Sequence, residues 1–405
     1  MLAVVLAACE GGGSGPEGGS GQAQAGANPP SPEARANSPS PGSVGPRTGR
    51  VADGEKGRFQ LSTAPGPAGA AASCAPLPSL HTQLAQLLLV GFPGTRAGPV
   101  SRGLVERGVG GLLLFGRNVV SAGQVRALVA DLKGRAEIPL EVAVDQEPGT
   151  RVARLRGIVR ASPSARELGR MPAERVERYG RVTGRDLAAL GVTADLAPVL
   201  DVTGARWDGV IGDRSFGSDP TTAGRAAVAF LRGLAAGGVA PVGKHFPGHG
   251  ATTVDSHQRL PVVPASMARL HAHDLAPFRA AIRSCLNAVM VGHLVVRAVD
   301  PGVPATLSPA VVDGLLRQRM GFGGLVVSDA LEMGAIATTV TIPVAAERAV
   351  KAGVDQLVLS GHGAVPAVLA HLERAVAAGR LSKTRVREAF LRVQAFKGVD
   401  RWAGC

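Results

Sequence analysis

Short apolar runs alternate with longer amphipathic stretches from Ser79 onward, and this alternation constrains the fold of the chain more than any other feature. It is typical of βα units, in which helices connect the parallel strands of one sheet. We count eight apolar runs: 87–91, 110–115, 140–144, 194–199, 240–243, 288–292, 324–327 and 356–359. Helix-like segments between them include 121–133, 173–190, 221–236 and 309–320. Eight such units predict an α/β protein with a (β/α)8 TIM barrel over residues 79–400. A doubly wound open sheet is the alternative, although no GxGxxG motif follows the first run.

Composition is consistent with one buried core and excludes two other classes of protein. With 45% hydrophobic and 19% charged residues, the chain can bury a large core and does not resemble a disordered or fibrous protein. No apolar run reaches the roughly 18 residues that a membrane-spanning helix requires, which excludes an integral membrane protein. The net charge of +13 would suit nucleic acid, anionic lipid or an acidic polymer, but scattered basic residues and only 3% aromatics argue against nucleic acid.

The first 78 residues differ in character from the rest of the chain. Residues 6–9 read Leu-Ala-Ala-Cys, which resembles the bacterial lipobox that precedes a lipid-modified cysteine. We therefore expect residues 1–9 to be a lipoprotein-type signal segment ending at Cys9, although no Lys or Arg precedes it. Residues 10–78 are rich in Gly, Pro, Ala and Ser, which predicts a disordered tether. Together they predict an exported lipoprotein of the cell envelope that contacts the membrane only through its lipid anchor. A chance cysteine in an Ala-rich start is the alternative.

Titratable residues follow several of the predicted strands, which is where the catalytic residues of a TIM barrel lie. Asp145 follows the third run, Lys244 and His245 the fifth, His293 the sixth and Asp329 the seventh. For each residue alone, a capping or core hydrogen bond is an equally good explanation. Their concentration at one edge of the barrel predicts an active site there.

The densest group of such residues is the segment 244–257, KHFPGHGATTVDSH. His245 and His249 have the spacing of zinc ligands on a helix, but the Pro-Gly pair between them would break a helix. Asp255 and His257 are two residues apart, a spacing that suits a tight loop in which the carboxylate fixes the tautomer of the imidazole. That pair predicts acid/base chemistry, whereas two solvated loop side chains are the simpler alternative.

Segment 244–257 resembles the KHFPGHG…DSH signature of glycoside hydrolase family 3, in its bacterial β-N-acetylglucosaminidase branch. The resemblance extends along residues 84–393. It includes the segments DQE (145–147), GVTADLAPVLD (191–201), IGDRSF (211–216), PATLSP (304–309) and GFGGLVVSDALEMGAI (321–336). These segments together are far more specific than any one of them.

The resemblance implies Asp329 as the nucleophile and His257 as the general acid/base, supported by Asp255. It also implies sugar contacts from Asp145, Arg151, Arg214, Lys244 and His245. A retaining glycosidase needs a carboxylate that forms a glycosyl ester and a second group that protonates the leaving oxygen. The second group is usually a carboxylic acid, so an Asp-His pair departs from the general pattern.

The family further implies an exo-acting enzyme that removes terminal β-linked N-acetylglucosamine, for example from peptidoglycan fragments. We expect a monomer that requires no cofactor and no metal. Two departures from the family pattern stand out. The chain reads DQEPGTRV where the family usually has DQEGGRV, so we expect Arg151 to be displaced from the sugar. Ala251 stands where the family commonly has aspartate, so the loop that carries Asp255 and His257 is expected to pack differently.

Two other functions remain as alternatives. A metal-dependent barrel hydrolase could use His245, His249, His293 and Asp329 as ligands. A catalytically impaired, sugar-binding surface lipoprotein would explain the two departures from the family pattern.

The four cysteines contain no CxxC pair and no metal-ligand spacing. Cys74 and Cys405 flank the predicted barrel and could form a disulfide in an exported protein. Cys285 lies in an apolar stretch and is expected to be a buried free thiol.

Overall fold

The structure is a computed structural model that describes residues 75–204 and 209–402. The expected signal segment with Cys9, and residues 10–74 of the expected linker, lie outside the described residues. None of the helices in the described ranges combines the length and apolarity needed to cross a membrane.

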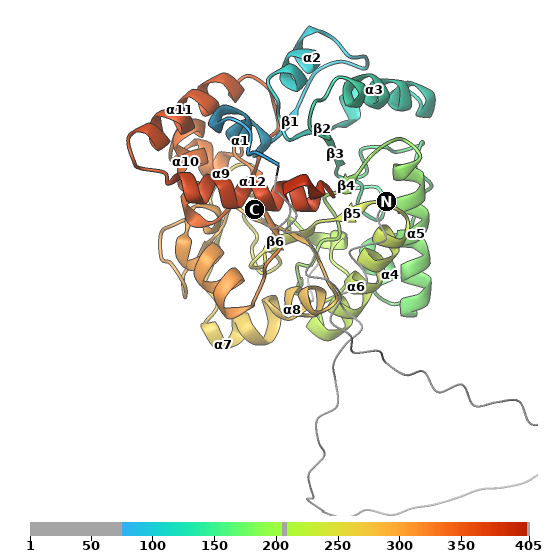
Figure 1. Cartoon of the computed structure of the whole chain (residues 1–405). Helices are drawn as coiled ribbons and strands as arrows, with labels where there is room; N and C mark the ends of the chain where they lie inside the picture. The colour runs from blue at the N-terminus through green and yellow to red at the C-terminus, as the bar shows by residue number, and fades with distance from the viewer. Residues whose placement is uncertain (1–74, 205–208, 403–405) are drawn as a thin grey trace, which may run out of the picture. The chain divides into compact units, whose positions relative to one another are not determined.

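Parallel strands form a TIM-type barrel, as the alternation of apolar runs predicted (Figure 1). The strands are β1 (Leu88–Gly91), β2 (Gly111–Leu114), β3 (Glu141–Val144), β4 (Ala194–Asp195), β5 (Ala240–Pro241), β6 (Gly243–Phe246), β8 (Ala288–Val291), β10 (Leu325–Ala330) and β11 (Gln356–Leu359). They pair in the order β5-β4-β3-β2-β1-β11-β10-β8-β6. Only Val242 separates β5 from β6, so these two pieces are the fifth strand of an eight-stranded ring and join the two ends of this order. A separate two-stranded sheet consists of β7 (Val262–Val263) and β9 (Val295–Val296).

The fourth strand is shorter than the run 194–199 that predicted it. Pro198 has no N–H to donate to a neighbouring strand, so regular pairing ends early. The chain beyond β4 still follows the barrel, because Lys244 N–H donates to Pro198 O at 3.1 Å and Val199 forms an isolated bridge with Lys244.

Helices form the outer ring in Figure 1. They are α1 (Leu80–Gln86), α2 (Pro99–Glu106), α3 (Ala122–Gly134), α4 (Ala165–Leu168), α5 (Ala173–Ala188), α6 (Pro220–Ala236), α7 (Met267–Arg269), α8 (Ala276–Arg283), α9 (Gly334–Ala337), α10 (Ile342–Ala352), α11 (Val365–Ala377) and α12 (Lys383–Phe396). Their starts follow from local chemistry: Ser121 caps α3 through Gln124 N–H, and Asp219 caps α6 ahead of a proline at its first turn.

Helices α5 and α6 pack so closely that glycine is required between them. A Cβ at Gly180 would lie 2.3 Å from Phe230 O, and one at Gly233 would lie 2.2 Å from Glu177 O. The expected helix over 309–320 is present as η5 (Ala310–Arg319), but it has π rather than α hydrogen bonding.

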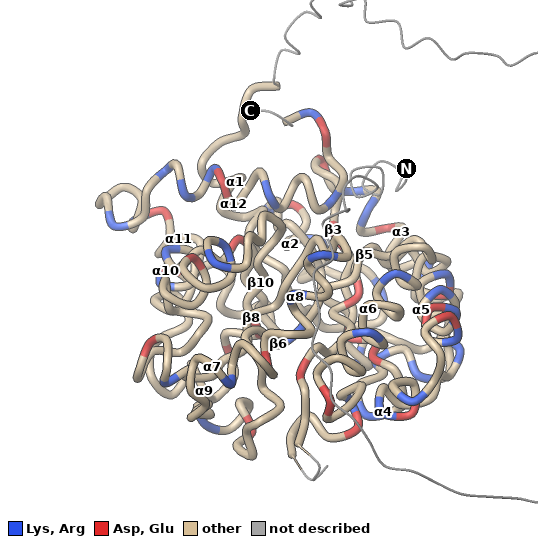
Figure 2. The backbone as a smooth tube through the Cα atoms, turned by 90° about the horizontal axis from the view of Figure 1, so that it is seen from below, with Lys and Arg blue, Asp and Glu red and all other residues tan. Residues whose placement is uncertain are grey.

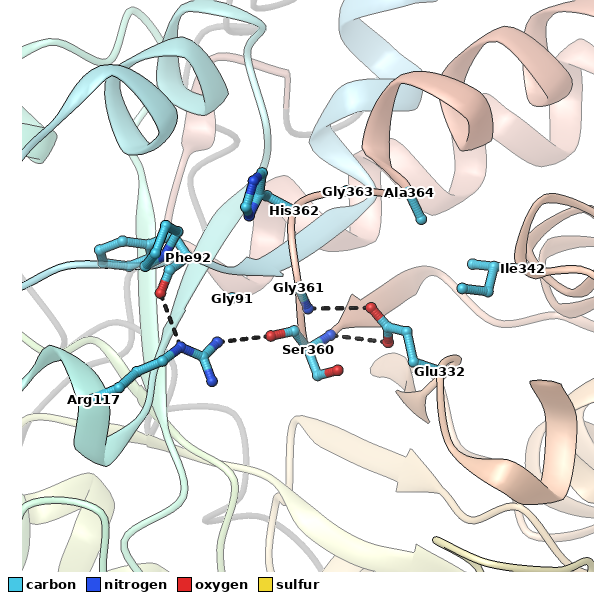
Figure 3. A pocket seen from close by; sticks show the side chains of 11 residues that line it. Gly91, Phe92, Arg117, Glu332, Ile342, Ser360, Gly361, His362, Gly363 and Ala364 are labelled. Carbon is cyan, nitrogen blue, oxygen red and sulfur yellow. Dashed lines mark hydrogen bonds between the residues drawn. The ribbon is translucent and has the colours of Figure 1, made fainter.

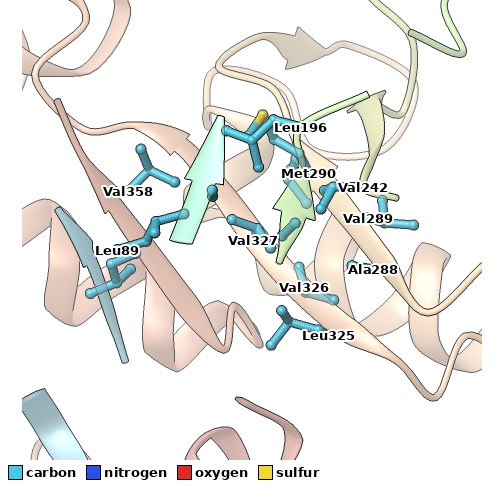
Figure 4. Close-up of a cluster of buried hydrophobic side chains, with 14 of the residues drawn as sticks. Leu89, Leu196, Val242, Ala288, Val289, Met290, Leu325, Val326, Val327 and Val358 are labelled. Carbon is cyan, nitrogen blue, oxygen red and sulfur yellow. The ribbon is translucent and has the colours of Figure 1, made fainter. Parts of the chain in front are cut away.

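The core fills the inside of the barrel and the layer between strands and helices. Figure 4 shows a cluster of buried side chains contributed by several strands, among them Leu89, Val242, Met290, Val327 and Val358. Because both faces of a parallel barrel are covered, its strands are nearly continuous apolar runs, which is the pattern that revealed them in the sequence.

Basic residues are distributed over the outer helices rather than gathered in one stripe. Figure 2 shows blue and red residues intermixed along α5 and its neighbours. Several of these charges pair with one another, as Arg181 does with Glu177 and Arg160 with Asp186. The positive net charge of the chain therefore does not form a single continuous surface on these helices.

The two ends of the described chain meet. Ala75 N–H donates to Arg401 O, and Trp402 Nε1–H donates to Pro76 O, each at 3.2 Å. Cys74 comes one residue before Ala75 and Cys405 three residues after Trp402, both outside the described residues, so a bridge between them is still a prediction.

The expectation of a buried free thiol at Cys285 is wrong, because this cysteine is disulfide-bonded. Its partner is one of the three cysteines outside the described residues, Cys9, Cys74 or Cys405, so the predicted Cys74–Cys405 bridge and a lipid on Cys9 exclude one another. Cys285 is only partly buried and follows the C-cap of α8 with φ 61°, in the left-handed region. Helix α8 thus ends at Arg283, and the turn that follows leaves Cys285 partly exposed.

Candidate active site

Glu147 lies at the centre of a buried ion cluster after β3. Its carboxylate accepts hydrogen bonds from Arg214 Nε and Nη2 at 2.7 and 2.8 Å, and its Oε1 lies 2.7 Å from Lys244 Nζ. Lys244 also donates to Asp145 Oδ1 at 2.7 Å. We call these four residues the Glu147 cluster. It brings together three of the residues that the family resemblance implied as sugar contacts.

Opposite charges keep Glu147 and Lys244 ionised although each residue is only 2% exposed. Burial opposes the ionisation of Glu147, but the charges of Lys244 and Arg214 hold its pKa well below its usual range. Burial also opposes the protonation of Lys244, but Asp145 and Glu147 raise its pKa above the usual value. Glu147 and Lys244 therefore both stay charged at neutral pH.

Asp201 orients His245 and the loop that follows it. Its Oδ2 lies 2.7 Å from His245 Nδ1, and its Oδ1 accepts His249 N–H at 2.7 Å. Burial opposes the ionisation of Asp201, but His245 and His249 hold its pKa below the usual value. Because a carboxylate only accepts hydrogen bonds, Nδ1 of His245 donates to Asp201 in this contact.

Asp329 lies within β10, one residue before its end, and not directly after the strand as expected. The register of β10 against β11 shifts between Val327 and Ala330, and such bulges re-aim side chains next to functional sites. Asp329 Oδ1 accepts Ala330 N–H at 2.8 Å. Burial opposes its ionisation, but His293 and His245 help to hold its pKa below the usual value. The side chain is therefore available as a carboxylate.

Asp255 and His257 make the contact that their spacing predicted. Asp255 Oδ1 lies 2.8 Å from His257 Nδ1 and accepts the His257 backbone N–H at 2.9 Å. Partial burial opposes the ionisation of Asp255, but these two hydrogen bonds lower its pKa below the usual value. The His257 side chain is 70% exposed, so its Nε2 can reach a ligand from the open side of the barrel.

The dyad loop, defined here as residues 255–258, is attached to the first two residues of α9, the helix that follows β10. Gly334 N–H donates to His257 O and Ala335 N–H donates to Ser256 O, both at 3.1 Å. A Cβ at Gly334 would lie 2.7 Å from His257 O, so this close approach requires glycine. The start of α9, which follows the strand that carries the predicted nucleophile, therefore holds the loop that carries the predicted acid/base pair.

His249 connects Asp201 to the dyad loop. Its Nδ1 lies 2.6 Å from Thr252 Oγ1 and its Nε2 lies 3.2 Å from Ser256 Oγ. Burial lowers the pKa of His249 below the usual value. The histidine thus acts as a buried link between two loops.

A metal centre built from these histidines fits the structure poorly. Both ring nitrogens of His249 already have protein partners. The same holds for His293, whose Nδ1 lies 2.8 Å from Thr306 Oγ1 and whose Nε2 lies 2.9 Å from Ala330 O. Within residues 75–204 and 209–402, no three His, Cys, Asp or Glu side chains are grouped so that they could hold a metal ion.

Arg151 lies outside the Glu147 cluster. Its Nη1 is 3.5 Å from Asp213 Oδ1, and both side chains are 48% exposed. Glu147 N–H donates to Val152 O at 2.9 Å, so the segment between them folds back as a turn. This turn is one residue longer than the family pattern, and Arg151 at its end pairs with Asp213 rather than with Glu147.

A pocket of ≈490 Å³ opens at the same edge of the barrel, beyond the ends of β1, β10 and β11. Figure 3 shows Arg117 reaching the carbonyl oxygens of Phe92 and Ser360, at 3.1 and 2.8 Å. Glu332, on the loop after β10, accepts the backbone N–H groups of Ser360 and Gly361. Glu332 of this pocket thus lies two residues before Gly334, which binds the dyad loop.

Three buried acids of this region were not singled out from the sequence: Glu147, Asp195 and Asp201. Each lies in a segment that matches the family pattern, and each ends or follows a strand. These are the two features that identified Asp145 from the sequence, and they applied to these acids as well. Their partners are far along the chain, since Arg214 is 67 residues from Glu147 and His245 is 44 residues from Asp201.

Comparison with known proteins places this geometry in a family. Residues 79–396 match the model of the glycosyl hydrolase family 3 N terminal domain. The chain is 40% identical over 348 residues to beta-hexosaminidase LpqI of Mycobacterium tuberculosis, covering 84% of this chain and 87% of that protein. A glycoside hydrolase family 3 beta-N-acetylglucosaminidase from Paenibacillus sp. str. FPU-7 has a similar structure, with a TM-score of 0.77 and 38% identity; the match covers 81% of this chain but 64% of that one. A family 3 glycosyl hydrolase from Mycobacterium smegmatis gives a TM-score of 0.75 at 41% identity, over 80% and 98% of the two chains. The chain therefore belongs to glycosyl hydrolase family 3.

Proposed function

We propose that this glycoside hydrolase is a retaining exo-β-N-acetylglucosaminidase that removes terminal β-linked N-acetylglucosamine. Its 40% identity to a beta-hexosaminidase supports the substrate class. The observation that carries the mechanism is the attachment of the dyad loop to the start of α9, the helix that follows Asp329 and β10, through the Gly334 and Ala335 N–H groups. It keeps a carboxylate and an imidazole on adjacent segments at one edge of the barrel.

In the first step, Asp329 attacks the anomeric carbon of the bound sugar, and the bond from that carbon to the leaving oxygen breaks. The product is a glycosyl ester on Asp329. Protonated His257 donates its Nε2 proton to the leaving oxygen, which departs as an alcohol. The low pKa of Asp329 suits this role because only the ionised carboxylate is nucleophilic.

In the second step, neutral His257 accepts a proton from water, and the resulting nucleophile attacks the anomeric carbon and releases Asp329. Asp255 acts through His257: it holds Nδ1–H at 2.8 Å, so Nε2 is the atom that gives and takes the proton. Two displacements at the same carbon return the original anomeric configuration.

The Glu147 cluster and His245 would hold the sugar. Arginine and lysine donate to hydroxyl and carbonyl oxygens, and Asp145 accepts from hydroxyl groups. Because their partners already fix these side chains, little conformational entropy is lost when substrate binds.

The test of the mechanism is His257→Ala given an activated aryl N-acetylglucosaminide. Such a leaving group needs little protonation, so the first step proceeds while release of the ester is slow. Mass spectrometry should then find a covalent sugar on the peptide that contains Asp329. The matched control is His271→Ala, which removes an exposed histidine of η3 (Leu270–Asp274) and should turn over without an adduct.

A sugar on another peptide, or products of inverted configuration, would contradict the mechanism. So would an Asp329→Asn variant that retains turnover. The substrate class has its own test, since equal kcat/KM on aryl glucosides and aryl N-acetylglucosaminides would contradict it.

A catalytically impaired sugar-binding protein is the second candidate, and the position of Arg151 favours it. This arginine pairs with Asp213 and not with the Glu147 cluster. Binding of N-acetylglucosamine without turnover of the aryl glycoside would support this candidate against the enzyme.

Peptidoglycan fragments as the source of substrate, and a lipid anchor at Cys9, complete the proposal. Product analysis of cell-wall digests, with and without phosphate as an alternative acceptor, tests the first. Labelling with radioactive palmitate tests the second: the wild-type chain should carry label, and Cys9→Ser should carry none.

A further inference from the structure

Asp195 is a buried carboxyl group beside the Glu147 cluster that takes no part in the proposed chemistry. It ends β4 and is fully shielded from solvent. Its Oδ1 accepts the backbone N–H of Gln146 at 2.9 Å. Its Oδ2 is buried and has no hydrogen-bond partner in the part of the chain that the structure describes. One oxygen of this carboxyl group is therefore hydrogen-bonded, and the other has no partner among the described residues.

The surroundings of Asp195 disfavour another negative charge. Burial is the largest influence and raises its pKa well above the ordinary value. Asp145 and Glu147, on the segment after β3, repel an ionised Asp195, whereas Lys244 on β6 attracts it. Lys244 already lies 2.7 Å from an oxygen of each of the other two acids, so it is not a dedicated counter-ion for Asp195.

We propose that Asp195 is a neutral carboxylic acid that positions the segment carrying Asp145 and Glu147. Gln146 lies between these two acids, and the hydrogen bond from its N–H to Asp195 fixes the peptide from which both extend. The Gln146 side chain closes the following turn, because its Oε1 accepts Leu155 N–H at 2.9 Å. A neutral acid supplies the acceptor that Gln146 needs without competing for Lys244.

The protonation state is tested by stability rather than by activity. A carboxyl whose folded pKa is raised stabilises the fold fully below its unfolded pKa, and this contribution is lost as pH rises through the folded pKa. Asp195→Asn keeps the shape of the neutral acid and does not titrate. Its Tm relative to the wild type should therefore rise between pH 4 and pH 7.

Glu347→Gln on α10 is the matched control, with the opposite sign. Glu347 is a buried acid in which burial opposes ionisation, but hydrogen bonds from Arg380 and His371 hold the pKa below the usual value. Its contribution to stability is present above the unfolded pKa and is lost as pH falls. The Tm of this variant relative to the wild type should therefore fall between pH 4 and pH 7. If Asp195→Asn behaves like Glu347→Gln, Asp195 is ionised and the proposal is wrong.

The positioning role is tested by activity and rests on the proposed function. Asp195→Asn should retain turnover of an aryl N-acetylglucosaminide, since its amide oxygen still accepts Gln146 N–H. Asp195→Leu has no acceptor, and the displaced segment should lower kcat/KM by about 100-fold. Equal kcat/KM for the two variants would contradict the positioning role. If the wild-type chain itself does not turn over the substrate, the proposed function fails, while the Tm measurements still decide the protonation state.

Discussion

Replacing Glu147 by Gln should both destabilise the barrel and weaken catalysis, because one side chain neutralises two buried cations. The Glu147 side chain is 1% exposed, and those of Lys244 and Arg214 are 3% and 12% exposed. The amide has one acceptor oxygen for the three short contacts that the carboxylate receives, and its NH2 group faces donors. Removing one partner from a buried ion pair costs about 3–5 kcal/mol. At about 2 °C per kcal/mol for a domain of this size, Tm should fall by about 6–10 °C.

The loss of activity follows from the same contacts. Without Glu147, Lys244 has only Asp145 to orient it, and the guanidinium of Arg214 loses both of its bonds to the cluster. Displacement of sugar-binding groups by about 1 Å costs about 100-fold, so kcat/KM on an aryl N-acetylglucosaminide should fall by about that factor. The assay is run well below the Tm of the variant, so that the folded fraction is the same in every sample.

Glu347→Gln separates a general loss of stability from an effect on the site. It also removes a carboxylate that contacts an arginine and a histidine, but on α10, away from the proposed sugar contacts and the dyad loop. Its Tm should fall and its kcat/KM should stay at the wild-type value. A Glu147→Gln variant that keeps both its Tm and its kcat/KM would refute the reasoning, because the contacts of Glu147 would then contribute neither energy nor orientation.

Three further predictions concern parts of the fold outside that cluster. Burial raises the pKa of Glu141 and lowers that of Lys397 to about 8, so at neutral pH the charged form of each side chain destabilises the fold. The double variant Glu141→Gln, Lys397→Met should therefore have a higher Tm than the wild type at pH 7. It should also lack the gain in stability that the wild type shows between pH 8 and the unfolded lysine pKa of 10.5. Gly334→Ala places a Cβ 2.6 and 2.7 Å from carbonyl oxygens of the dyad loop, so it should lower kcat more for poor leaving groups than for activated ones. The control Gly323→Ala places a Cβ with no atom within 4 Å and should leave kcat unchanged. Cys285→Ser removes a disulfide, so it should cost about 2–5 kcal/mol by denaturant unfolding, and dithiothreitol should lower the Tm of the wild type only.

The fold could be predicted from the sequence because barrel strands are buried on both faces and appear as apolar runs. Where prediction failed, a local feature opposed the pattern. Pro198 ended regular pairing of the fourth strand early, and a bulge moved the end of β10 beyond Asp329. Cys285 was misjudged because its stretch is apolar, whereas the turn after α8 exposes part of its side chain.

The individual hydrogen bonds of the candidate site were predictable only where the two partners are close in the sequence. Asp255 and His257 are two residues apart, so their hydrogen bond could be anticipated. Lys244 and Asp145 are 99 residues apart, and only the closed barrel shows that Lys244 donates a hydrogen bond to Asp145. Buried acids such as Asp195 look like any strand-end polar residue until the positions of their neighbours are known.

The two halves of the proposed mechanism are held with very different rigidity, and this separates the effects that their variants should have. Of the proposed sugar contacts, Asp145, Lys244 and His245 lie on strands or just after them and are fixed by ion pairs, with the Lys244 side chain 3% exposed. The acid/base His257 side chain is 70% exposed, on a loop attached to its neighbour by the backbone N–H groups of Gly334 and Ala335. Changes in the buried cluster should therefore alter KM and Tm together. Changes in the dyad loop should alter kcat in proportion to how much protonation the leaving group needs and leave Tm nearly unaffected, because an exposed loop contributes little to the core.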